Sequence, residues 1–140
     1  MQNIVVVSID TELAYNTAKK IADIMNFQYQ DADSMFKDRI VNMVDYPIDF
    51  ADDLMRNVEL NLLKELSKID KSVVAITDDM FLSNTGIKHF ENSLKICVKK
   101  DVAEDILSGL QDLLLKKCDV AFYEKDLDHD KLIKILTNKE

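Results

Sequence analysis

Short runs of consecutive apolar residues, separated by longer amphipathic stretches, constrain the fold of this chain more than any other feature of its sequence. The first run, Ile4-Val5-Val6-Val7, contains no polar residue, as expected of a strand covered on both faces of a sheet. The stretch 12–26 repeats apolar residues at intervals of three and four, which predicts a helix with one face against that sheet. The residues expected to dock it are Leu13, Ala18, Ile21 and Met25.

The same alternation of strand and helix continues to the end of the chain. Further strands are predicted at 27–30, 73–76, 94–98 and 120–123, and helices at 54–69, 84–93, 102–113 and 132–136. The segment 31–53 contains the only proline, Pro47, and predicts short helices and a turn. Strands that alternate with helices are joined by right-handed crossovers. We therefore predict one domain, 1–140, with a three-layer α/β/α fold over a five-stranded parallel sheet.

Several helix boundaries and faces are predicted from polar caps and apolar stripes. Ser83 or Asn84 is expected to cap the helix at 84–93, and Asp101 the helix at 102–113. The run 126–130 lacks the glycine and the later Glu of a calcium loop, so it too is expected to cap a helix. The expected apolar stripe of the helix at 102–113 is Val102, Ile106, Leu110 and Leu113, and the final helix is expected to contain Leu132, Ile133 and Leu136.

Charge and composition exclude several classes of partner. The net charge of −8 argues against nucleic acid, and basic runs such as Lys99-Lys100 are short and expected at solvated strand or helix ends. No segment has the roughly 18 apolar residues that span a bilayer, and no signal-peptide pattern opens the chain. Cys97 and Cys118 fit no metal spacing and no CxxC motif. We expect a cytoplasmic protein with two buried free thiols and with neither nucleic-acid nor membrane partners.

Ligands of parallel α/β sheets bind at the carboxyl ends of the strands, so residues just after each strand are the site candidates. Clustered carboxylates there suit Mg²⁺ or Ca²⁺. The alternative is that they cap helices, pair with Arg56 or remain solvated. The carboxylates expected to line one cleft beside Arg56 are Asp10, Asp31, Asp33, Asp78 and Asp79, of which Asp31, Asp78 and Asp79 are the metal candidates.

At these strand ends the sequence resembles the shikimate kinases, small phosphate-loop kinases that transfer the γ-phosphate of ATP to shikimate. Asp31-Ala32-Asp33 is similar to the family's Asp-x-Asp, and Arg56-Asn57-Val58-Glu59 is similar to its Arg-x-x-Glu. The resemblance extends from Asn3 to about Leu136 and implies the kinase fold. It also implies that Asp31 lies near the magnesium, that Asp33 holds shikimate hydroxyls, and that Arg56 grips the shikimate carboxylate.

The sequence departs from this family where a kinase holds ATP. The family's Gly-rich loop corresponds here to a degenerate stretch, Ser8-Ile9-Asp10-Thr11-Glu12-Leu13-Ala14-Tyr15. Its glycines fall on Ser8, Thr11 and Leu13, its lysine on Ala14, and its magnesium-binding hydroxyl on Tyr15. The family's Gly-Gly-Gly after the third strand is Thr77-Asp78-Asp79, and the lid with its catalytic Arg has no counterpart. The whole chain has two glycines, whereas a phosphate cradle uses several.

The residues that replace the loop oppose a bound phosphate. Asp10 and Thr11 are placed to cap the following helix, and Glu12 adds negative charge to its first turn. These side chains satisfy the N–H groups that a phosphate would use and repel the phosphate itself. We therefore expect no ATP binding at 8–16 and no cofactor.

Three functions remain open. The first is a non-catalytic binding or regulatory module that acts on a protein partner or as a homo-oligomer. The second is a divergent shikimate or other small-molecule kinase, which would need ATP and Mg²⁺. The third is a non-catalytic binder of a small carboxylated ligand through Arg56. Because a free ligand surrenders translational freedom and an internal partner does not, we expect Asp33, Asp78 or Asp79 to engage Arg56 instead.

Overall fold

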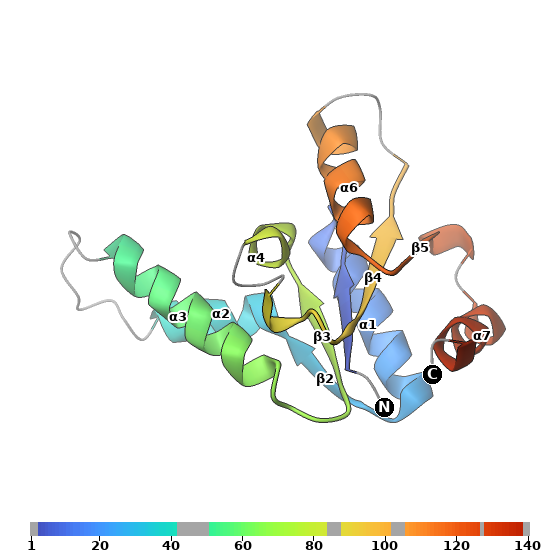
Figure 1. Cartoon of the computed structure of the whole chain (residues 1–140), viewed down its shortest axis with the longest axis horizontal. Coiled ribbons are helices and arrows are strands. Elements are labelled where there is room, and N and C mark those ends of the chain that lie inside the picture. Colours follow the sequence, from blue (N-terminus) through green and yellow to red (C-terminus); the bar gives the residue numbers. More distant parts are fainter. Residues whose placement is uncertain (1–2, 42–50, 84–87, 102–105, 127, 139–140) are drawn as a thin grey trace.

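A sheet of parallel strands forms the centre of the structure (Figure 1). The computed structural model describes residues 3–41, 51–83, 88–101, 106–126 and 128–138. Within these ranges five strands pair in the order β2-β3-β1-β4-β5, and every pair is parallel. The predicted five-stranded parallel sheet is confirmed. The strands are β1 (Ile4–Val7), β2 (Gln28–Asp31), β3 (Ser72–Ile76), β4 (Leu94–Lys99) and β5 (Val120–Tyr123).

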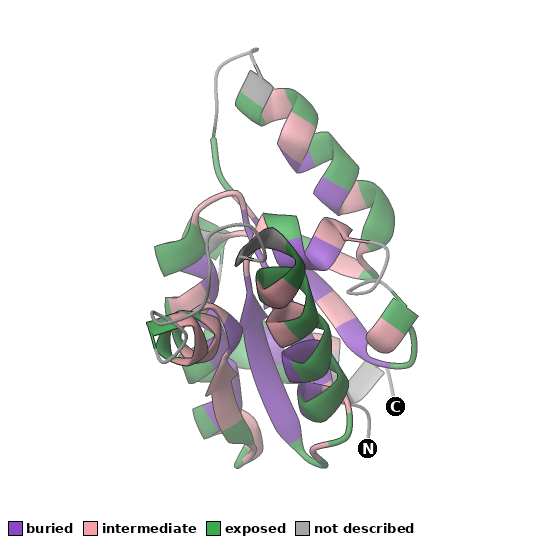
Figure 2. Cartoon of the chain, turned by 90° about the vertical axis from the view of Figure 1, so that its left-hand side faces the viewer, coloured by how far each residue is buried: buried purple, intermediate pink, exposed green. Residues whose placement is uncertain are grey.

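The apolar run that opens the chain is the central strand. β1 pairs with β3 on one side and with β4 on the other, so that Ile4 lies opposite both Val73 and Leu94. Successive side chains of a strand point to opposite faces. Val5 and Val7 accordingly enter one core while Ile4 and Val6 enter the other, and all four are buried. Helices on both faces therefore explain why this run contains no polar residue (Figure 2).

One face of the sheet is covered by α1 (Thr11–Met25) and α7 (His129–Asn138). The predicted docking of α1 is confirmed, because Leu13, Ala18 and Ile21 are buried and Met25 packs beside them. The prediction that Leu132, Ile133 and Leu136 belong to a final helix is confirmed, although Ile133 is 38% exposed. Leu132 and Ile135 contact the core, and the side chain of Leu136 lies outside the described part. The helix begins as expected, with Asp128 Oδ1 accepting from Lys131 N at 2.7 Å.

The helices with described bounds on the other face are α2 (Ala32–Val41), α3 (Ala51–Leu66), α4 (Asp78–Leu82) and α6 (Ile106–Lys117). Leu62, Leu63 and Leu66 of α3 meet Phe81 of α4 in the centre of this second core. Together with α1 and α7 these helices complete the predicted three-layer α/β/α arrangement. No helix among the described residues has the length and apolar character needed to cross a membrane.

Helix α4 was not predicted from the sequence, and it precedes the helix predicted at 84–93, of which residues 88–89 are helical in the described part. Residues 84–87, at the start of the predicted helix, lie outside the described residues, and Ser83 is the C-cap of α4. The N-cap of α4 is Thr77, whose Oγ1 accepts from Met80 N at 3.3 Å and starts the helix directly after β3. Asp78 and Asp79 then occupy its first turn, where negative charge complements the helix dipole.

Helix α6 is rotated relative to the predicted stripe. Leu113 is 50% exposed, whereas Leu114 is fully buried and Leu115 is partly buried. A helix could bury either Leu113 or Leu114. The hydrogen bonds of the buried Gln111, described below, favour the rotation that buries Leu114. Val102 and the start of this helix after Asp101 lie outside the described residues, as does the side chain of Ile106.

Candidate functional site

The connection from β1 to α1 is where the resemblance implies a phosphate-binding loop, and here it is short and its own side chains bond to its backbone. Ser8 is buried, and its Oγ accepts from Asp10 N at 3.1 Å. Asp10 is the N-cap of α1, and its Oδ1 accepts from Leu13 N at 3.2 Å. The helix therefore begins at Thr11, inside the stretch that corresponds to the loop, and its first free N–H groups face the chain's own carboxylate.

A lysine from the far end of β4 completes this arrangement. Lys100 Nζ donates to Asp10 Oδ2 at 2.8 Å. The Lys100 ammonium, followed by the Leu13 N–H, lowers the pKa of the Asp10 carboxyl below its ordinary value. The end of α1 thus holds an internal anion with its own counter-cation.

Gln111 of α6 positions the backbone of Lys100. Its Oε1 accepts from Lys100 N at 2.7 Å, and its Nε2 donates to Lys100 O at 3.0 Å. Gln111 is itself buried, so this pair of bonds ties α6 to the end of β4. Sequence reasoning missed both residues. The sequence did contain a signal for this contact, because Gln111 lies among the leucines of a predicted helix and a buried polar side chain requires hydrogen-bond partners.

The positions that correspond to the kinase lysine and hydroxyl are used for packing. Ala14 is 1% exposed and lies in the core between α1 and the sheet. The ring of Tyr15 contacts that of Tyr29 edge-on, with centroids 5.3 Å apart, and Lys19 Nζ lies 4.3 Å from the Tyr15 centroid. Thr11 and Glu12 are exposed. A lysine placed at Ala14 would bury its charge among apolar side chains, which is strongly unfavourable.

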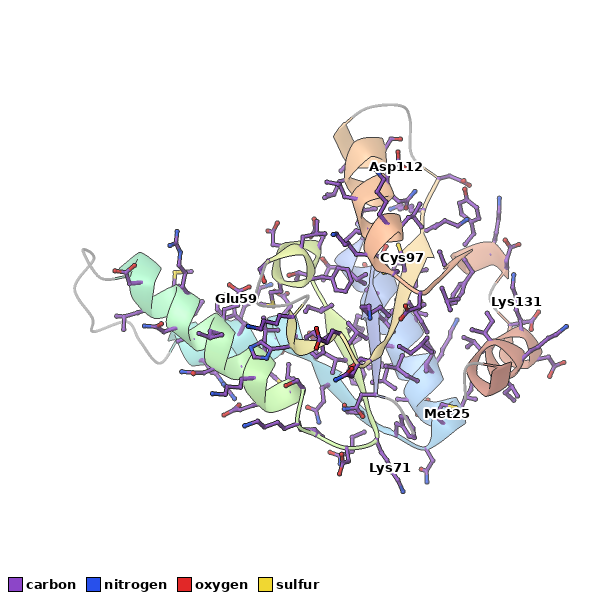
Figure 3. The ribbon with its side chains drawn as sticks, in the orientation of Figure 1. Met25, Glu59, Lys71, Cys97, Asp112 and Lys131 are labelled. Carbon is purple, nitrogen blue, oxygen red and sulfur yellow. The ribbon has the colours of Figure 1, made fainter. Side chains whose placement is uncertain are left out.

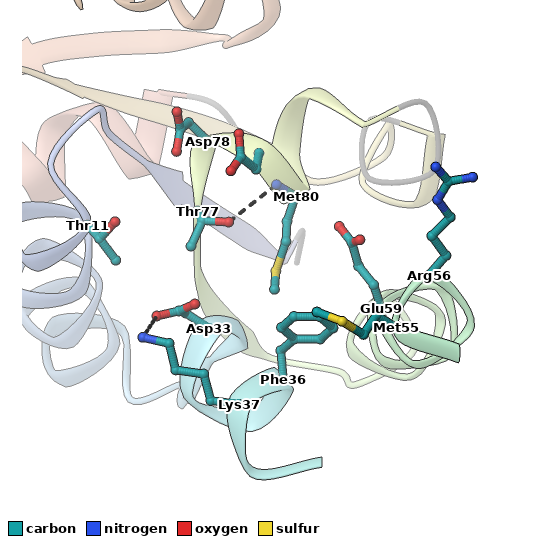
Figure 4. A pocket seen from close by; sticks show the side chains of 11 residues that line it. Thr11, Asp33, Phe36, Lys37, Met55, Arg56, Glu59, Thr77, Asp78 and Met80 are labelled. Carbon is teal, nitrogen blue, oxygen red and sulfur yellow. Dashed lines mark hydrogen bonds and ion pairs between the residues drawn. The ribbon is translucent and has the colours of Figure 1, made fainter. Parts of the chain in front are cut away.

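A cleft of about 730 Å³ opens at the carboxyl ends of β1, β2 and β3 (Figure 4). Helices α2 and α3 form two of its walls, and Thr77 with the first turn of α4 forms a third. Its apolar surface comes from Phe36, Met55 and Met80. This is the edge of the sheet at which ligands of parallel α/β folds bind.

The charged residues of this cleft are mostly acidic. Asp33, Glu59, Asp78 and Asp79 contribute carboxylates, and Lys37 and Arg56 contribute the cations. Lys37 Nζ lies 3.0 Å from Asp33 Oδ2, one turn along α2. Burial, and after it the charge of Asp79, raises the pKa of Glu59. Glu59 is labelled on α3 in Figure 3, beside α4.

Arg56 is exposed, and its side chain points away from the centre of the cleft (Figure 4). Across the described ranges no ion pair joins it to Asp33, Asp78 or Asp79, so the predicted internal pairing is wrong. Asp33 pairs with Lys37 instead, because residues four apart on one helix are neighbours without any bridging between helices. The grip on a carboxylate that the resemblance implies for Arg56 stays a prediction.

The predicted single cluster of aspartates is wrong for two of its members. Asp31 caps α2, where its Oδ1 accepts from Ser34 N at 3.1 Å. Asp10 faces a second cavity of about 310 Å³ at the ends of β4 and β5, beside Lys99 and Tyr123. The start of α1 separates the two cavities. Among the residues that the structure describes, no group of three His, Cys, Asp or Glu is arranged to hold a metal ion.

Comparison with known proteins identifies the fold. No family model and no curated protein matches the sequence. Among solved structures, the shikimate kinase of Aquifex aeolicus aligns with a TM-score of 0.67 at 13% identity, covering 97% of this chain and 94% of that one. The shikimate kinase of Acinetobacter baumannii, solved in complex with shikimate, gives 0.69 at 15% identity, with 99% and 93% covered. A sugar kinase of Janibacter sp. gives 0.51 at 13% identity, with 99% and 93% covered. The chain therefore has the shikimate-kinase fold.

Proposed function

We propose that this chain is a kinase-fold protein that does not transfer phosphate and serves as a non-catalytic binding module. The observation that carries the proposal is the Asp10 carboxylate, which accepts from Leu13 N and from Lys100 Nζ at the N-terminus of α1. Phosphate-loop kinases bind phosphate at such a helix end, through free N–H groups and a nearby lysine. Here a carboxylate of the chain uses both kinds of donor.

The energetics favour the internal anion over a nucleotide. Two unit negative charges 4 Å apart repel by about 4 kcal/mol at an effective dielectric near 20. A phosphate beside Asp10 would meet that repulsion and would also have to displace the carboxylate from its donors. It would lose translational freedom as well, which the covalently attached carboxylate does not. The proposal accordingly includes neither ATP nor another cofactor.

The cleft between α2, α3 and α4 is the proposed ligand site. Its volume of about 730 Å³ falls within the range of about 300–1,000 Å³ that small-molecule sites occupy. Lys37 is already paired with Asp33, and Arg56 points away, so the carboxylates of Glu59, Asp78 and Asp79 dominate the interior. This charge favours a small cationic ligand, such as an amine with an apolar body, over a carboxylated one. Signalling from the cleft would then go to a cytoplasmic protein partner or to a second copy of the chain.

Calorimetric titration of the full chain tests both parts of the proposal. We expect no heat of binding with Mg²⁺-ATP or with shikimate, and a saturable signal with an alkyl diamine or polyamine. Glu59→Gln should weaken the amine signal by about tenfold, the cost of losing one partly buried charge contact of about 1.4 kcal/mol. Glu91→Gln is the matched control, because Glu91 is exposed and lies outside the cleft.

Two results separate the proposal from its alternatives. ATP-dependent phosphorylation of shikimate, with binding of Mg²⁺-ATP, would establish the divergent kinase. Saturable shikimate binding that Arg56→Ala removes, without any ATP binding, would establish the carboxylate binder. Either result contradicts a non-catalytic module with a site for cations.

A further inference from the structure

The second cavity, of about 310 Å³ at the ends of β4 and β5, has no part in the proposed function and differs in charge from the acidic cleft. β5 is the last strand of the sheet and pairs with β4 (Figure 1). Three lysines and two aspartates line the cavity, together with Leu13 and Tyr123. This lining therefore carries a surplus of positive charge, in a chain whose net charge is −8.

The surplus charge lies on the side of the cavity formed by β5. On the side of α1, Lys100 is neutralised by Asp10 at 2.8 Å. Lys125 Nζ lies 3.7 Å from Asp101 Oδ2, but these side chains are 68% and 77% exposed, and an ion pair so exposed contributes little. Among the residues that the structure describes, no carboxylate lies within ion-pair distance of Lys99, which is half-buried.

The ring of Tyr123 gathers two ammonium groups at this side of the cavity. Lys99 lies opposite Tyr123 where β4 pairs with β5, and its Nζ is 4.2 Å from the centre of the ring. Lys125 Nζ is 5.1 Å from the same centre. The face of an aromatic ring attracts cations, so the ring positions both groups without neutralising either. An anionic ligand that contacts both lysines relieves the repulsion between them.

We propose that this cavity binds a small dicarboxylate, with one carboxylate on Lys99 and the other on Lys125. Two separate points of positive charge match two separate anionic groups better than a single one. Leu13 and the ring of Tyr123 offer apolar surface to the carbon chain between the carboxylates. The cavity lies at the lower end of the range of about 300–1,000 Å³ for small-molecule sites, which favours a short ligand. The ligand replaces Asp101, whose exposed pair with Lys125 is easily displaced.

A dicarboxylate fits this cavity better than a polyphosphate does. A chain of phosphates would extend toward α1, where the Asp10 carboxylate already occupies Lys100 and repels further negative charge. A ligand held by Lys99 and Lys125 keeps its charge at the side of β5. Because the start of α1 separates the two cavities, binding here is independent of a cation in the cleft between α2, α3 and α4.

An NMR titration of the full chain with succinate, at low and constant ionic strength, tests the site. We expect saturable shifts of the amide resonances at 99–101 and 123–125. Butyrate has as many carbons as succinate but one carboxylate, and it should bind about fivefold more weakly, as expected for loss of one exposed ion pair. Lys99→Gln and Lys125→Gln should each weaken succinate binding by a similar factor. Lys20→Gln is the matched control, because it removes an exposed lysine outside both cavities.

Further variants separate this site from the cleft and from a nucleotide site. Tyr123→Leu should weaken succinate binding because the two ammonium groups lose their ring, whereas Tyr123→Phe should preserve it. Glu59→Gln, in the other cavity, should have no effect. The exposed Lys125 keeps the test decisive if Lys99→Gln does not fold. The proposal is overturned if butyrate binds as tightly as succinate, if Lys125→Gln binds succinate like wild type, or if Mg²⁺-ATP displaces succinate.

Discussion

Lys100 holds the carboxylate of Asp10 at 2.8 Å across a sequence separation of 90 residues. The pair closes the N-terminal end of α1, the end at which phosphate-loop kinases bind their nucleotide. Gln111 supports it from behind through two hydrogen bonds to the Lys100 backbone. The end of β4 and helix α6 thus support one carboxylate at the start of α1, and its removal should alter both stability and anion binding.

Asp10→Ala should lower the free energy of unfolding by about 1–2 kcal/mol at neutral pH, from loss of an N-cap and of an exposed ion pair. Asp10→Asn keeps a capping oxygen and should cost less. Because the pKa of Asp10 is lowered in the folded state, its contribution is present above the unfolded value of about 3.9 and is lost as the pH falls through the folded value. Urea unfolding between pH 2 and pH 7 measures this. A difference between wild type and Asp10→Asn that does not shrink at acid pH would contradict it.

Asp10→Ala should also gain affinity for inorganic phosphate. Without the carboxylate, the first-turn N–H groups of α1 and the Lys100 ammonium become an anion site. Phosphate at several times its Kd should then stabilise the variant by about 1 kcal/mol relative to chloride of equal ionic strength. Thermal unfolding measures the effect. Glu12→Ala removes the same charge from the same turn without opening those donors, so an equal gain there would contradict the prediction.

Glu59→Gln should stabilise the protein slightly at neutral pH. Burial and Asp79 raise the pKa of Glu59, so the folded state carries a cost whenever this carboxyl is ionised. That cost is present above the folded pKa and disappears as the pH falls below the unfolded value of about 4.3. The melting temperatures of wild type and variant should therefore converge in acid. Equal stability at pH 7, or a less stable variant, would show that Glu59 makes a favourable contact.

Leu114→Ala should lower the free energy of unfolding by about 2–5 kcal/mol, because it empties a fully buried position. Leu113→Ala, the same change one residue earlier on α6, should change the free energy of unfolding by no more than about 0.5 kcal/mol, since that side chain is 50% exposed. Denaturant unfolding of the pair tests the rotation of α6. The opposite ranking would restore the stripe predicted from the sequence.

Burial on both faces of the sheet could be predicted because each buried position requires an apolar residue, which is visible in the sequence. For this reason the predictions are correct for the buried strand Ile4-Val5-Val6-Val7 and for the buried stripe of α1. The cap at Asp10 could be predicted as well, since a cap depends on residues within one turn. The register of α6 could not, because Leu113 and Leu114 are chemically identical and the choice between them rests on the hydrogen bonds of Gln111 to Lys100, just after β4.

The candidate site was harder to predict than the fold for a similar reason. Asp33 and Arg56 were expected to meet because both were placed near one edge of the sheet. A neighbour on the same helix, Lys37, pairs with Asp33 instead, and Arg56 points away. Lys100 was missed because nothing within its own segment indicates that it lies beside Asp10. Only the strand order, which places β4 next to β1, brings the two together.

The central place of β1 also determines how the chain acquires its structure. The strand partners of Ile4 are Val73 and Leu94, so the middle of the sheet forms only after long stretches of chain have been closed into loops. Non-local pairing of this kind slows folding. Because synthesis proceeds from the N-terminus, β1 is made before β4, its partner on the second side. A nascent chain that ends before Leu94 therefore leaves one edge of β1 without its partner, and such an unpaired apolar edge favours aggregation.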